Sequence, residues 1–189
     1  MNDSTSVALP PGYPADLERT WQAADGTEIH LRPLKPDDLD RELQFLAGLS
    51  EQTLYLRLQY TASEIRREDA ARMLELDYRD TIAFGALTGD PPGDTLVGVS
   101  RYARIDGTDQ AECAIVVTDA WQGRGVGTEL MRALGVAARR NGIRTLVGGS
   151  LAENQRIHAW ARRFGFDVRT EPNTGGQVQV TLDLTSLPS

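Results

Sequence analysis

The sequence predicts an α/β fold in which a central mixed, mostly antiparallel sheet carries helices on both faces. The segments 81–87, 96–104 and 111–117 are apolar or alternate between apolar and polar residues, with turn residues between them, which is typical of an antiparallel meander. A glycine-rich turn at 123–127 joins the last of these strands to a helix. Strand and helix patterns then alternate toward the C-terminus, which indicates a mixed rather than a purely antiparallel sheet.

Each element follows from its local pattern. Residues 1–20 contain Pro10, Pro11 and Pro14 among small and acidic residues, so we expect a flexible N-terminal arm followed by a single domain over 21–186. Apolar periodicity predicts strands at 28–33, 81–87, 96–104, 111–117, 144–149, 167–170 and 177–184, and helices at 36–49, 51–59, 64–76, 126–141 and 153–164.

The helix after the glycine-rich turn has one apolar face. Val126, Leu130 and Leu134, with Met131 and Ala138 beside them, recur at the spacing of a buried stripe. We therefore expect this helix to pack against the sheet.

The glycine-rich turn has the chemistry of an anion-binding loop. Gly123, Gly125 and Gly127 lack the Cβ atoms that would keep a ligand from the backbone, and glycine adopts positive φ at no steric cost. The helix that begins near Val126 presents unpaired N–H groups and the positive end of its dipole to the same place. The turn therefore predicts a phosphorylated cofactor.

The glycine spacing separates three loops of this kind. A nucleotide-triphosphate P-loop needs a lysine, which the turn lacks. A dinucleotide fingerprint needs a third glycine one residue later, and an acidic residue about 20 residues on, but no Asp or Glu occurs between Glu129 and Glu153. The pattern that remains, Gln122-x-x-Gly125-x-Gly127 after a strand, resembles the acetyl-coenzyme A loop of the GNAT N-acetyltransferase superfamily.

Other segments extend the resemblance over residues 27–170. Asn154 stands where these enzymes open a helix beside the pantetheine arm, and Gly165-Phe166 stands where that helix ends. Residues 29–39 and 49–58 are similar to the acetyltransferase domain of bacterial protein-lysine acetyltransferases. The resemblance implies a GNAT-like sheet in which two splayed parallel strands form the coenzyme cleft.

The resemblance also implies roles for individual residues. Glu112, near the start of the strand that leads to the glycine loop, matches the strand glutamate that acts as general base on a lysine, and a bridging water or burial would strengthen it. Val117 is the expected main-chain donor to the oxyanion. The residues expected to bind acetyl-coenzyme A are Ile115, Val116, Val117, Gln122, Gly123, Arg124, Gly125, Val126, Gly127, Thr128 and Asn154.

One position departs from the superfamily pattern. Many of these enzymes place a tyrosine acid seven residues after the helix-opening asparagine, and this chain has Ala161 there. The lysine-acetylating branch often lacks that tyrosine as well. Protonation of the departing thiolate is therefore left to water or to another group, with Tyr55, Tyr60 and Tyr78 as candidates.

Charge and composition narrow the partners. The 189 residues carry a formal net charge of −7, which argues against a nucleic-acid binder. A local cationic segment nevertheless follows the glycine loop. Arg132, Arg139 and Arg140 in this segment read as the solvated face of a helix, whereas Arg124, inside the loop, is the better candidate for an anion ligand.

The remaining composition predicts a cytoplasmic protein without a metal. No window approaches the roughly 18 apolar residues of a membrane helix. The single cysteine, Cys113, precludes an internal disulfide and reads as a small core residue. His30 and His158 are too few and too far apart for a recognisable metal site.

Three functions stay open. The first is an N-acetyltransferase that uses acetyl-coenzyme A and acts on a protein lysine. The second is an acetyltransferase for a small-molecule amine, which a closed acidic acceptor pocket would favour over an open groove. The third is a non-catalytic acyl-coenzyme A sensor. The acyl group, the acceptor and the oligomeric state do not follow from the sequence.

Overall fold

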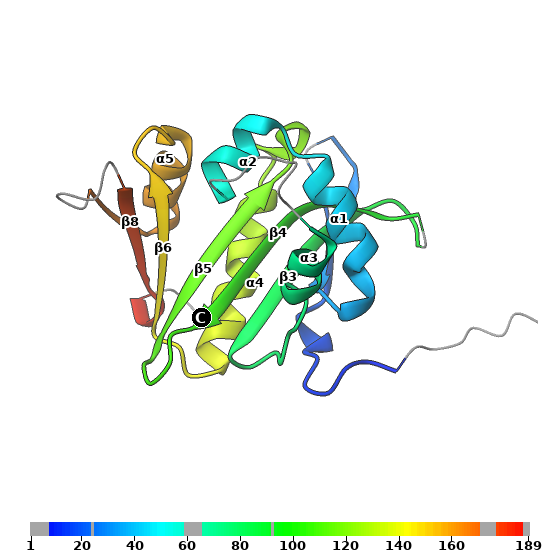
Figure 1. Cartoon of the computed structure of the whole chain (residues 1–189), viewed down its shortest axis with the longest axis horizontal. Helices are drawn as coiled ribbons and strands as arrows, with labels where there is room; N and C mark the ends of the chain where they lie inside the picture. Colours follow the sequence, from blue (N-terminus) through cyan, green and yellow to red (C-terminus); the bar gives the residue numbers. More distant parts are fainter. Residues whose placement is uncertain (1–7, 24, 59–65, 92, 171–176, 187–189) are drawn as a thin grey trace, which may run out of the picture.

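The computed structural model describes residues 8–23, 25–58, 66–91, 93–170 and 177–186. Over these residues eight strands form one sheet in the order β1-β2-β3-β4-β5-β6-β8-β7, and every neighbouring pair is antiparallel except β5 and β6 (Figure 1). The strands are β1 (Arg19–Gln22), β2 (Glu28–Pro33), β3 (Thr81–Thr88), β4 (Thr95–Arg104), β5 (Gln110–Val117), β6 (Thr145–Leu151), β7 (Asp167–Thr170) and β8 (Gln177–Asp183). The predicted mixed, mostly antiparallel sheet is confirmed.

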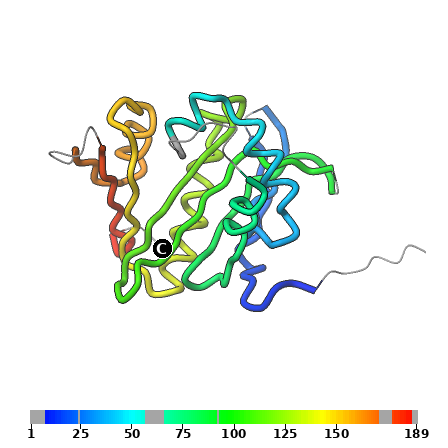
Figure 2. Tube along the Cα trace, viewed as in Figure 1, coloured from blue at the N-terminus to red at the C-terminus, as the bar shows by residue number. Residues whose placement is uncertain are grey.

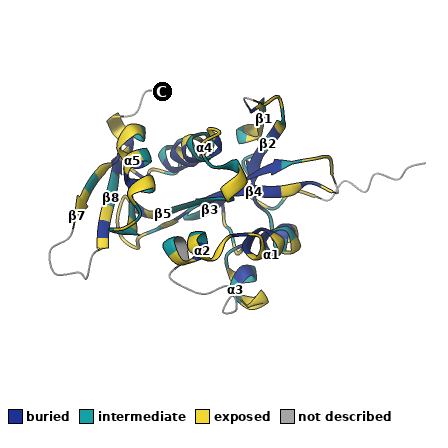
Figure 3. Cartoon of the chain, turned by 90° about the horizontal axis from the view of Figure 1, so that it is seen from above, coloured by how far each residue is buried: buried dark blue, intermediate teal, exposed yellow. Residues whose placement is uncertain are grey.

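Helices cover both faces of the sheet, also as predicted. The helices are α1 (Leu39–Ala47), α2 (Glu51–Leu58), α3 (Arg67–Arg72), α4 (Val126–Arg140) and α5 (Gln155–Phe164). Helices α1, α2 and α3 lie on one face, and α4 and α5 lie on the other (Figure 3). In the described ranges no helix is long and apolar enough to span a bilayer.

The hydrophobic core is divided by the sheet into two clusters. On one face, the predicted stripe of α4 is buried against the strands, with Leu130 and Leu134 fully inaccessible. On the other face, Phe45 and Leu46 of α1 pack with Leu74. The sheet is thus held from both sides over β2 to β5.

The first strand was not expected. We predicted an arm through residue 20, but Arg19 already pairs with Leu31 of β2. The Tyr13 ring packs edge-on against Tyr78 at 5.5 Å between centroids, and its hydroxyl donates to Glu18 Oε1 at 2.6 Å. These contacts hold the chain against the sheet from Tyr13 on, as its path in Figure 2 shows.

The third helix is also shorter than the predicted range 64–76, whose first two residues lie outside the described ranges. Helix α3 ends at Arg72. The amides of Leu74 and Glu75 then bond three residues back, to Ala71 and Arg72, as in a tight turn. This turn carries Leu74 into the core, where it is 2% exposed.

Candidate active site

The site begins where two neighbouring strands separate. Parallel pairing between β5 and β6 covers only three positions and ends at Glu112 opposite Val147. Beyond that point β5 stays paired with β4, and β6 stays paired with β8. The two strands therefore diverge as a V in the middle of the sheet (Figure 1), which confirms the predicted splayed pair.

Two hydrogen bonds fix which main-chain groups of β5 face the V. The Thr118 amide donates to the Val97 carbonyl at 2.9 Å, and the Ile105 amide donates to the Gln110 carbonyl at 2.9 Å. Bonded and non-bonded positions alternate along an antiparallel pair. The even-numbered residues of β5 are therefore bonded to β4, and the odd-numbered residues direct their N–H and C=O groups the other way.

Cys113, Ile115 and Val117 accordingly point their main-chain groups toward the V. The V is still narrow at Cys113, where a Cβ on Gly148 would lie 3.1 Å from the Cys113 carbonyl oxygen. The Val117 carbonyl accepts a hydrogen bond from Gln122 Nε2 at 2.9 Å, which ties the strand end to the glycine loop. Val116 directs its amide toward β4, so its main chain is not offered to the V. Two of the three predicted strand residues, Ile115 and Val117, thus present amides there.

A cavity of about 1220 Å³ occupies the V. Its lining comes from α4 and α5 on one face of the sheet and from α2 on the other, so the cavity passes through the sheet. The predicted site residues that line it are Ile115, Val116, Val117, Gln122, Gly123, Gly125, Gly127, Thr128 and Asn154. Glu112, Arg124 and Val126 do not line it.

The glycine loop has the backbone that its sequence predicts. Gly123 and Gly125 have φ of +79° and +89°, in the left-handed region that favours glycine. Gly125 is the N-cap of α4, and the first i→i−4 bond of the helix runs from the Glu129 amide to its carbonyl at 3.1 Å. A Cβ at Gly125 would meet nothing within 4 Å, so the loop leaves open space before the helix.

Gly127 has a different reason to be glycine. A Cβ there would lie 3.4 Å from Ile115 Cδ1 and 3.7 Å from Val117 Cγ2. The missing side chain lets the first turn of α4 lie close to β5. This closeness brings the amino end of the helix beside the amides that face the V.

The cation expected at the loop is engaged elsewhere. Arg124 Nη1 lies 2.5 Å from Asp25 Oδ2, and its guanidinium stacks on the Trp121 ring at 4.9 Å from the centroid. Another cation, Arg156 on α5, lines the cavity with its Nη2 3.8 Å from the place of a Gly123 Cβ. No hydrogen bond or ion pair of the Arg156 side chain occurs within the part of the chain that the structure describes.

The sequence analysis did not name Arg156 as a coenzyme ligand. Its position two residues after Asn154, a predicted coenzyme-binding residue, could have indicated it. Arg132 and Arg139, which we assigned to the solvated face of α4, also line the cavity, as does Arg163 of α5. The cationic lining is thus supplied by both helices rather than by the loop.

Helix α5 begins and ends as predicted. Asn154 is its N-cap, and the side-chain oxygen accepts from the Ile157 amide at 3.2 Å. Gly165 ends the helix at φ +115°. Ala161, at the position of the missing tyrosine, is buried and lines the cavity.

A buried histidine stands behind the cavity wall. His158 on α5 is 3% exposed, and its Nε2 lies 2.6 Å from Ser150 Oγ on β6. Burial lowers the pKa of this imidazole below its ordinary 6.5, and the nearby Arg162 lowers it further. The sequence indicated no metal site at this histidine and gave no sign of this contact, which adds a polar pair with the cavity-lining Ser150 to the site.

Glu112 occupies the closed end of the V. Alternation along β5 places its side chain with Ala114 and Val116 on the face of α1 to α3, whereas Cys113 lines the cavity from the opposite face. The sequence suggested that burial or a bridging water would strengthen Glu112 as a base. Glu112 is exposed, so only the bridging water remains.

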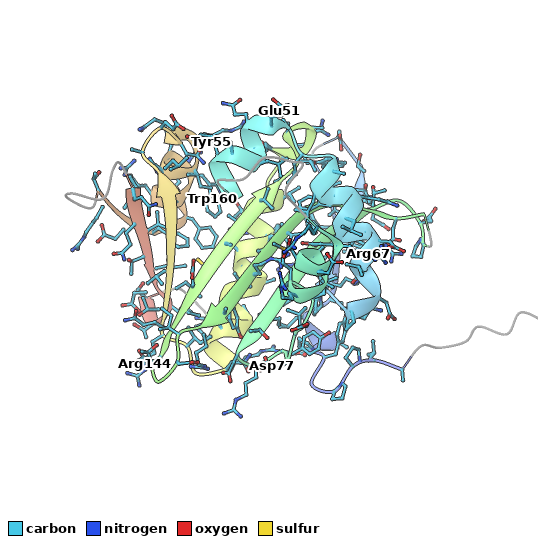
Figure 4. The ribbon with its side chains drawn as sticks, viewed as in Figure 1. Glu51, Tyr55, Arg67, Asp77, Arg144 and Trp160 are labelled. Carbon is cyan, nitrogen blue, oxygen red and sulfur yellow. The ribbon has the colours of Figure 1, made fainter. Side chains whose placement is uncertain are left out.

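Of the three tyrosine candidates, neither of the two that the structure describes lines the cavity. Tyr78 is buried and its hydroxyl donates to the Leu34 carbonyl at 3.1 Å. Tyr55 projects from α2 with 52% of its surface exposed (Figure 4). Tyr60 lies outside the described residues. In the described ranges no group of three or more His, Cys, Asp or Glu side chains could hold a metal ion.

Comparison with known proteins adds three relationships. The profile of the acetyltransferase (GNAT) domain family matches residues 28–167. An acetyltransferase from Pseudomonas aeruginosa is 34% identical over 154 residues, which cover 82% of this chain and 83% of that protein. The acetyltransferase Pat from Mycolicibacterium smegmatis is 30% identical over 144 residues, which cover 76% of this chain and 43% of Pat.

Among solved structures, the GNAT domain of S. lividans PAT superposes with a TM-score of 0.81 at 27% identity. The match covers 90% of this chain and 99% of that domain. The likeness therefore extends over the sheet and both helical layers.

Proposed function

The chain belongs to the GNAT family of acetyl-coenzyme A-dependent N-acetyltransferases, and from that premise we propose that it acetylates a protein lysine by direct transfer, with Glu112 as general base. One observation carries the proposal. A single cavity connects the glycine loop to Ile115 and Val117 of β5, whose amides face the V, and continues through the sheet to α2. A coenzyme can enter such a passage from one face and an amine from the other.

The coenzyme diphosphate is assigned to the amides of residues 123–127. These groups precede the first hydrogen bond of α4, and the helix dipole adds positive potential. Arg156 stands beside Gly123 without an ion-pair partner among the described residues, so it supplies the full charge that Arg124 does not. Gln122, Val126 and Thr128 support this loop, and Asn154 borders the pantetheine arm.

The oxyanion is assigned to the amides of β5. As the lysine nitrogen bonds to the thioester carbon, negative charge develops on the carbonyl oxygen, and fixed N–H groups stabilise it. Val117 remains the expected donor. Ile115, two residues nearer to Glu112 along β5, points its amide into the same V. The bond from Gln122 to the Val117 carbonyl holds this strand end in place.

Glu112 is assigned the proton of the attacking amine. A lysine with a reference pKa of about 10.4 is protonated at neutral pH and must lose a proton before it attacks. Glu112 faces away from α4, toward the side from which the acceptor would approach, and it takes the proton through a bridging water. The thiolate of the coenzyme leaves as the carbon–sulfur bond breaks and is protonated by water, since Ala161 carries no acid.

The open surroundings of Glu112 favour a protein acceptor over a small amine. The carboxylate is exposed rather than enclosed. An extended lysine can cross such a surface. A small metabolite would gain little from it, because small-molecule sites enclose most of their ligand.

A thiol-release assay tests the proposal. Acetyl-coenzyme A is supplied with lysine peptides, intact proteins, and a panel of amino acids, polyamines and drug amines. Faster release with intact proteins supports the lysine assignment, and faster release with one small amine replaces it by the second function. Calorimetric binding of acetyl-coenzyme A without transfer to any amine would identify a sensor.

Glu112→Gln tests the base. We expect turnover to fall by about 10²–10⁴ while coenzyme affinity stays the same. Glu28→Gln is the matched control, because Glu28 is an exposed strand glutamate on β2, far from β5 in the sheet order. If Glu112→Gln keeps the full rate from neutral to mildly alkaline pH, another group is the base.

A further inference from the structure

The cavity does not end where the strands meet. On α4 its lining recurs at one-turn intervals, at Gly127, Met131, Gly135 and Arg139. At 1.5 Å per residue, Gly135 lies about 12 Å and Arg139 about 18 Å along the helix from Gly127. A trough therefore follows α4 for most of its length.

The amides of β5 that face the V cover only the upper part of this trough. From Val117 to Cys113 the strand advances about 13 Å. Helix α4 runs alongside this strand. At one end Gly127 lies close to Val117. Near the other end Asn141, just after α4, donates from Nδ2 to the Tyr102 hydroxyl at 2.8 Å, and Tyr102 of β4 pairs with Cys113. The trough at Gly135 thus lies level with the last such amide, and its remainder extends farther from the glycine loop.

The lining around Gly135 is apolar, and the cationic Arg139 lies one turn farther along α4. Met131 is 1% exposed and Phe166 is 5% exposed, and Val180 of β8 faces them. Phe166 stacks at 5.9 Å from Phe164, which also lines the trough. Gly135 adds no side chain, so space is left among apolar walls. We name this end, lined by Met131, Gly135, Val136, Phe166 and Val180, the acyl chamber.

We propose that the acyl chamber receives the alkyl chain of an acyl-coenzyme A longer than acetyl. The inference rests on the proposed function, because it needs the diphosphate at the glycine loop and the thioester carbonyl at the β5 amides. The coenzyme fills the trough on the glycine-loop side of that carbonyl, so an alkyl chain that follows the trough extends from the carbonyl into the chamber. An acetyl methyl leaves it unfilled, whereas a butyryl or hexanoyl chain buries two or four more methylenes there. The transfer itself is unchanged: the amine nitrogen bonds to the acyl carbon and the thiolate departs.

A donor series tests the inference on the unaltered protein. Acetyl-, propionyl-, butyryl- and hexanoyl-coenzyme A are compared by thiol release with one acceptor. We expect kcat/KM to rise about three- to fourfold per methylene up to butyryl, as burial of about 0.8 kcal/mol per methylene implies. A maximum at acetyl with a steep fall for propionyl and butyryl would overturn the inference, and so would a preference for succinyl- over butyryl-coenzyme A.

Two variants localise the effect. Gly135→Leu should abolish the gain for butyryl-coenzyme A while acetyl transfer stays within about threefold, and leucine also favours the helix. Val136→Ala should shift the optimum toward hexanoyl-coenzyme A. An unchanged chain-length profile in both folded variants would place the alkyl chain elsewhere and overturn the inference. If no acyl-coenzyme A binds or reacts, the proposed function fails; if acetyl-coenzyme A alone reacts, only the chamber does.

Discussion

The two parts of the sheet differ in how completely the backbone is paired. From β1 to β5 each strand is paired with its neighbours, and core clusters lie on both faces. Within the sheet, the part formed by β6, β8 and β7 joins the rest through three residue pairs, and the cavity separates the two above that joint. Below it the two parts share one buried core, since Leu146 and Leu182 belong to the same cluster as Leu130 of α4. The difference shows that the candidate site is a place where strand pairing is withheld, so that main-chain amides stay available to a ligand.

The fully paired part is further fixed by buried ion pairs. Arg32 meets Asp38 with two hydrogen bonds of 2.7 and 2.6 Å, and Arg41 joins Asp38 to Asp94. Burial alone would raise the pKa of Asp38, but the Arg32 guanidinium outweighs it and holds this pKa below its ordinary value. No comparable buried pair is found in the described residues of β6, α5, β7 and β8. We therefore expect substitutions in the first part to change stability and substitutions at the V to change binding and rate.

The largest expected effect is that of Asp38→Ala. Removal of one partner leaves Arg32 as a buried, uncompensated charge, which should lower the free energy of unfolding by about 3–5 kcal/mol. Urea denaturation measures this loss. Coenzyme affinity of the folded fraction should be unchanged, since Asp38 does not line the cavity.

Asp40→Ala is the control for Asp38→Ala. Asp40 pairs with Arg67 at 3.0 Å, but both side chains are more than half exposed, so we expect a loss of at most about 1 kcal/mol. Similar losses in the two variants would show that burial of the Arg32 pair does not distinguish this part of the sheet.

A smaller effect is expected at the glycine loop. Gly125→Val forces a β-branched residue to φ +89° and crowds the space before α4. Either backbone strain of about 1–3 kcal/mol is retained or the loop shifts, and a shift should weaken acetyl-coenzyme A binding by about 5- to 150-fold. Isothermal calorimetry measures the affinity.

Gly107→Val is the control for the loop. Gly107 has φ +72° and open space around it, as Gly125 has, but it lies in the turn between β4 and β5, at the opposite end of β5 from the glycine loop. Its substitution should cost stability without reducing coenzyme affinity. If Gly125→Val binds acetyl-coenzyme A as tightly as Gly107→Val, the amides of 123–127 do not hold the diphosphate.

These loop residues also show how far the sequence could predict the site. The glycines act through their own backbone, so their spacing was sufficient to predict the left-handed turn and the start of α4. Asn154 likewise caps its own helix. Arg124, in contrast, forms an ion pair with Asp25, about 100 residues away in sequence. No local sequence pattern indicates that partner.

Long-range contacts explain the other differences as well. Strand β1 has few apolar residues, and it forms because β2 offers an edge and because Arg19 donates to the Glu129 carbonyl at 2.6 Å. The exposure of Glu112 depends on which helices cover that face of the sheet, and strand alternation fixes only the direction of the side chain. Local periodicity thus predicts elements and turns, while exposure and ion pairing require the assembled sheet.

The joint of the V is expected to respond more weakly than the loop. A Cβ on Gly148 would lie 3.1 Å from the Cys113 carbonyl oxygen, so Gly148→Ala requires a shift of a few tenths of an ångström. We expect a stability loss of about 1 kcal/mol and a reduced transfer rate, because the strands are pushed apart beside the reacting centre. Gly149→Ala is the control, since its Cβ would meet nothing within 4 Å. Equal rates in both variants would show that the width of the joint does not matter.

The smallest effect concerns His158, which links β6 and α5 behind the cavity. Because burial lowers the pKa of His158 in the folded protein, the neutral imidazole is favoured there, and the unfolded chain binds the proton more readily. Its contribution to stability should be present above the ordinary pKa of 6.5 and be lost as the pH falls below it toward the folded-state value. Denaturation at pH 7.5, 6.5 and 5.5 should show a steeper decline for the wild type than for His158→Gln.

Amide hydrogen exchange shows where this loss occurs. Protonation of His158 disturbs its contact with Ser150, so the amides of α5 and β6 should exchange faster at pH 5.5 before those of α1 and β3 do. This order would confirm that the part of the sheet beyond the V opens independently of the fully paired part. Simultaneous acceleration in all four elements would mean that the three residue pairs and the core cluster shared with α4 couple the two parts into one cooperative unit.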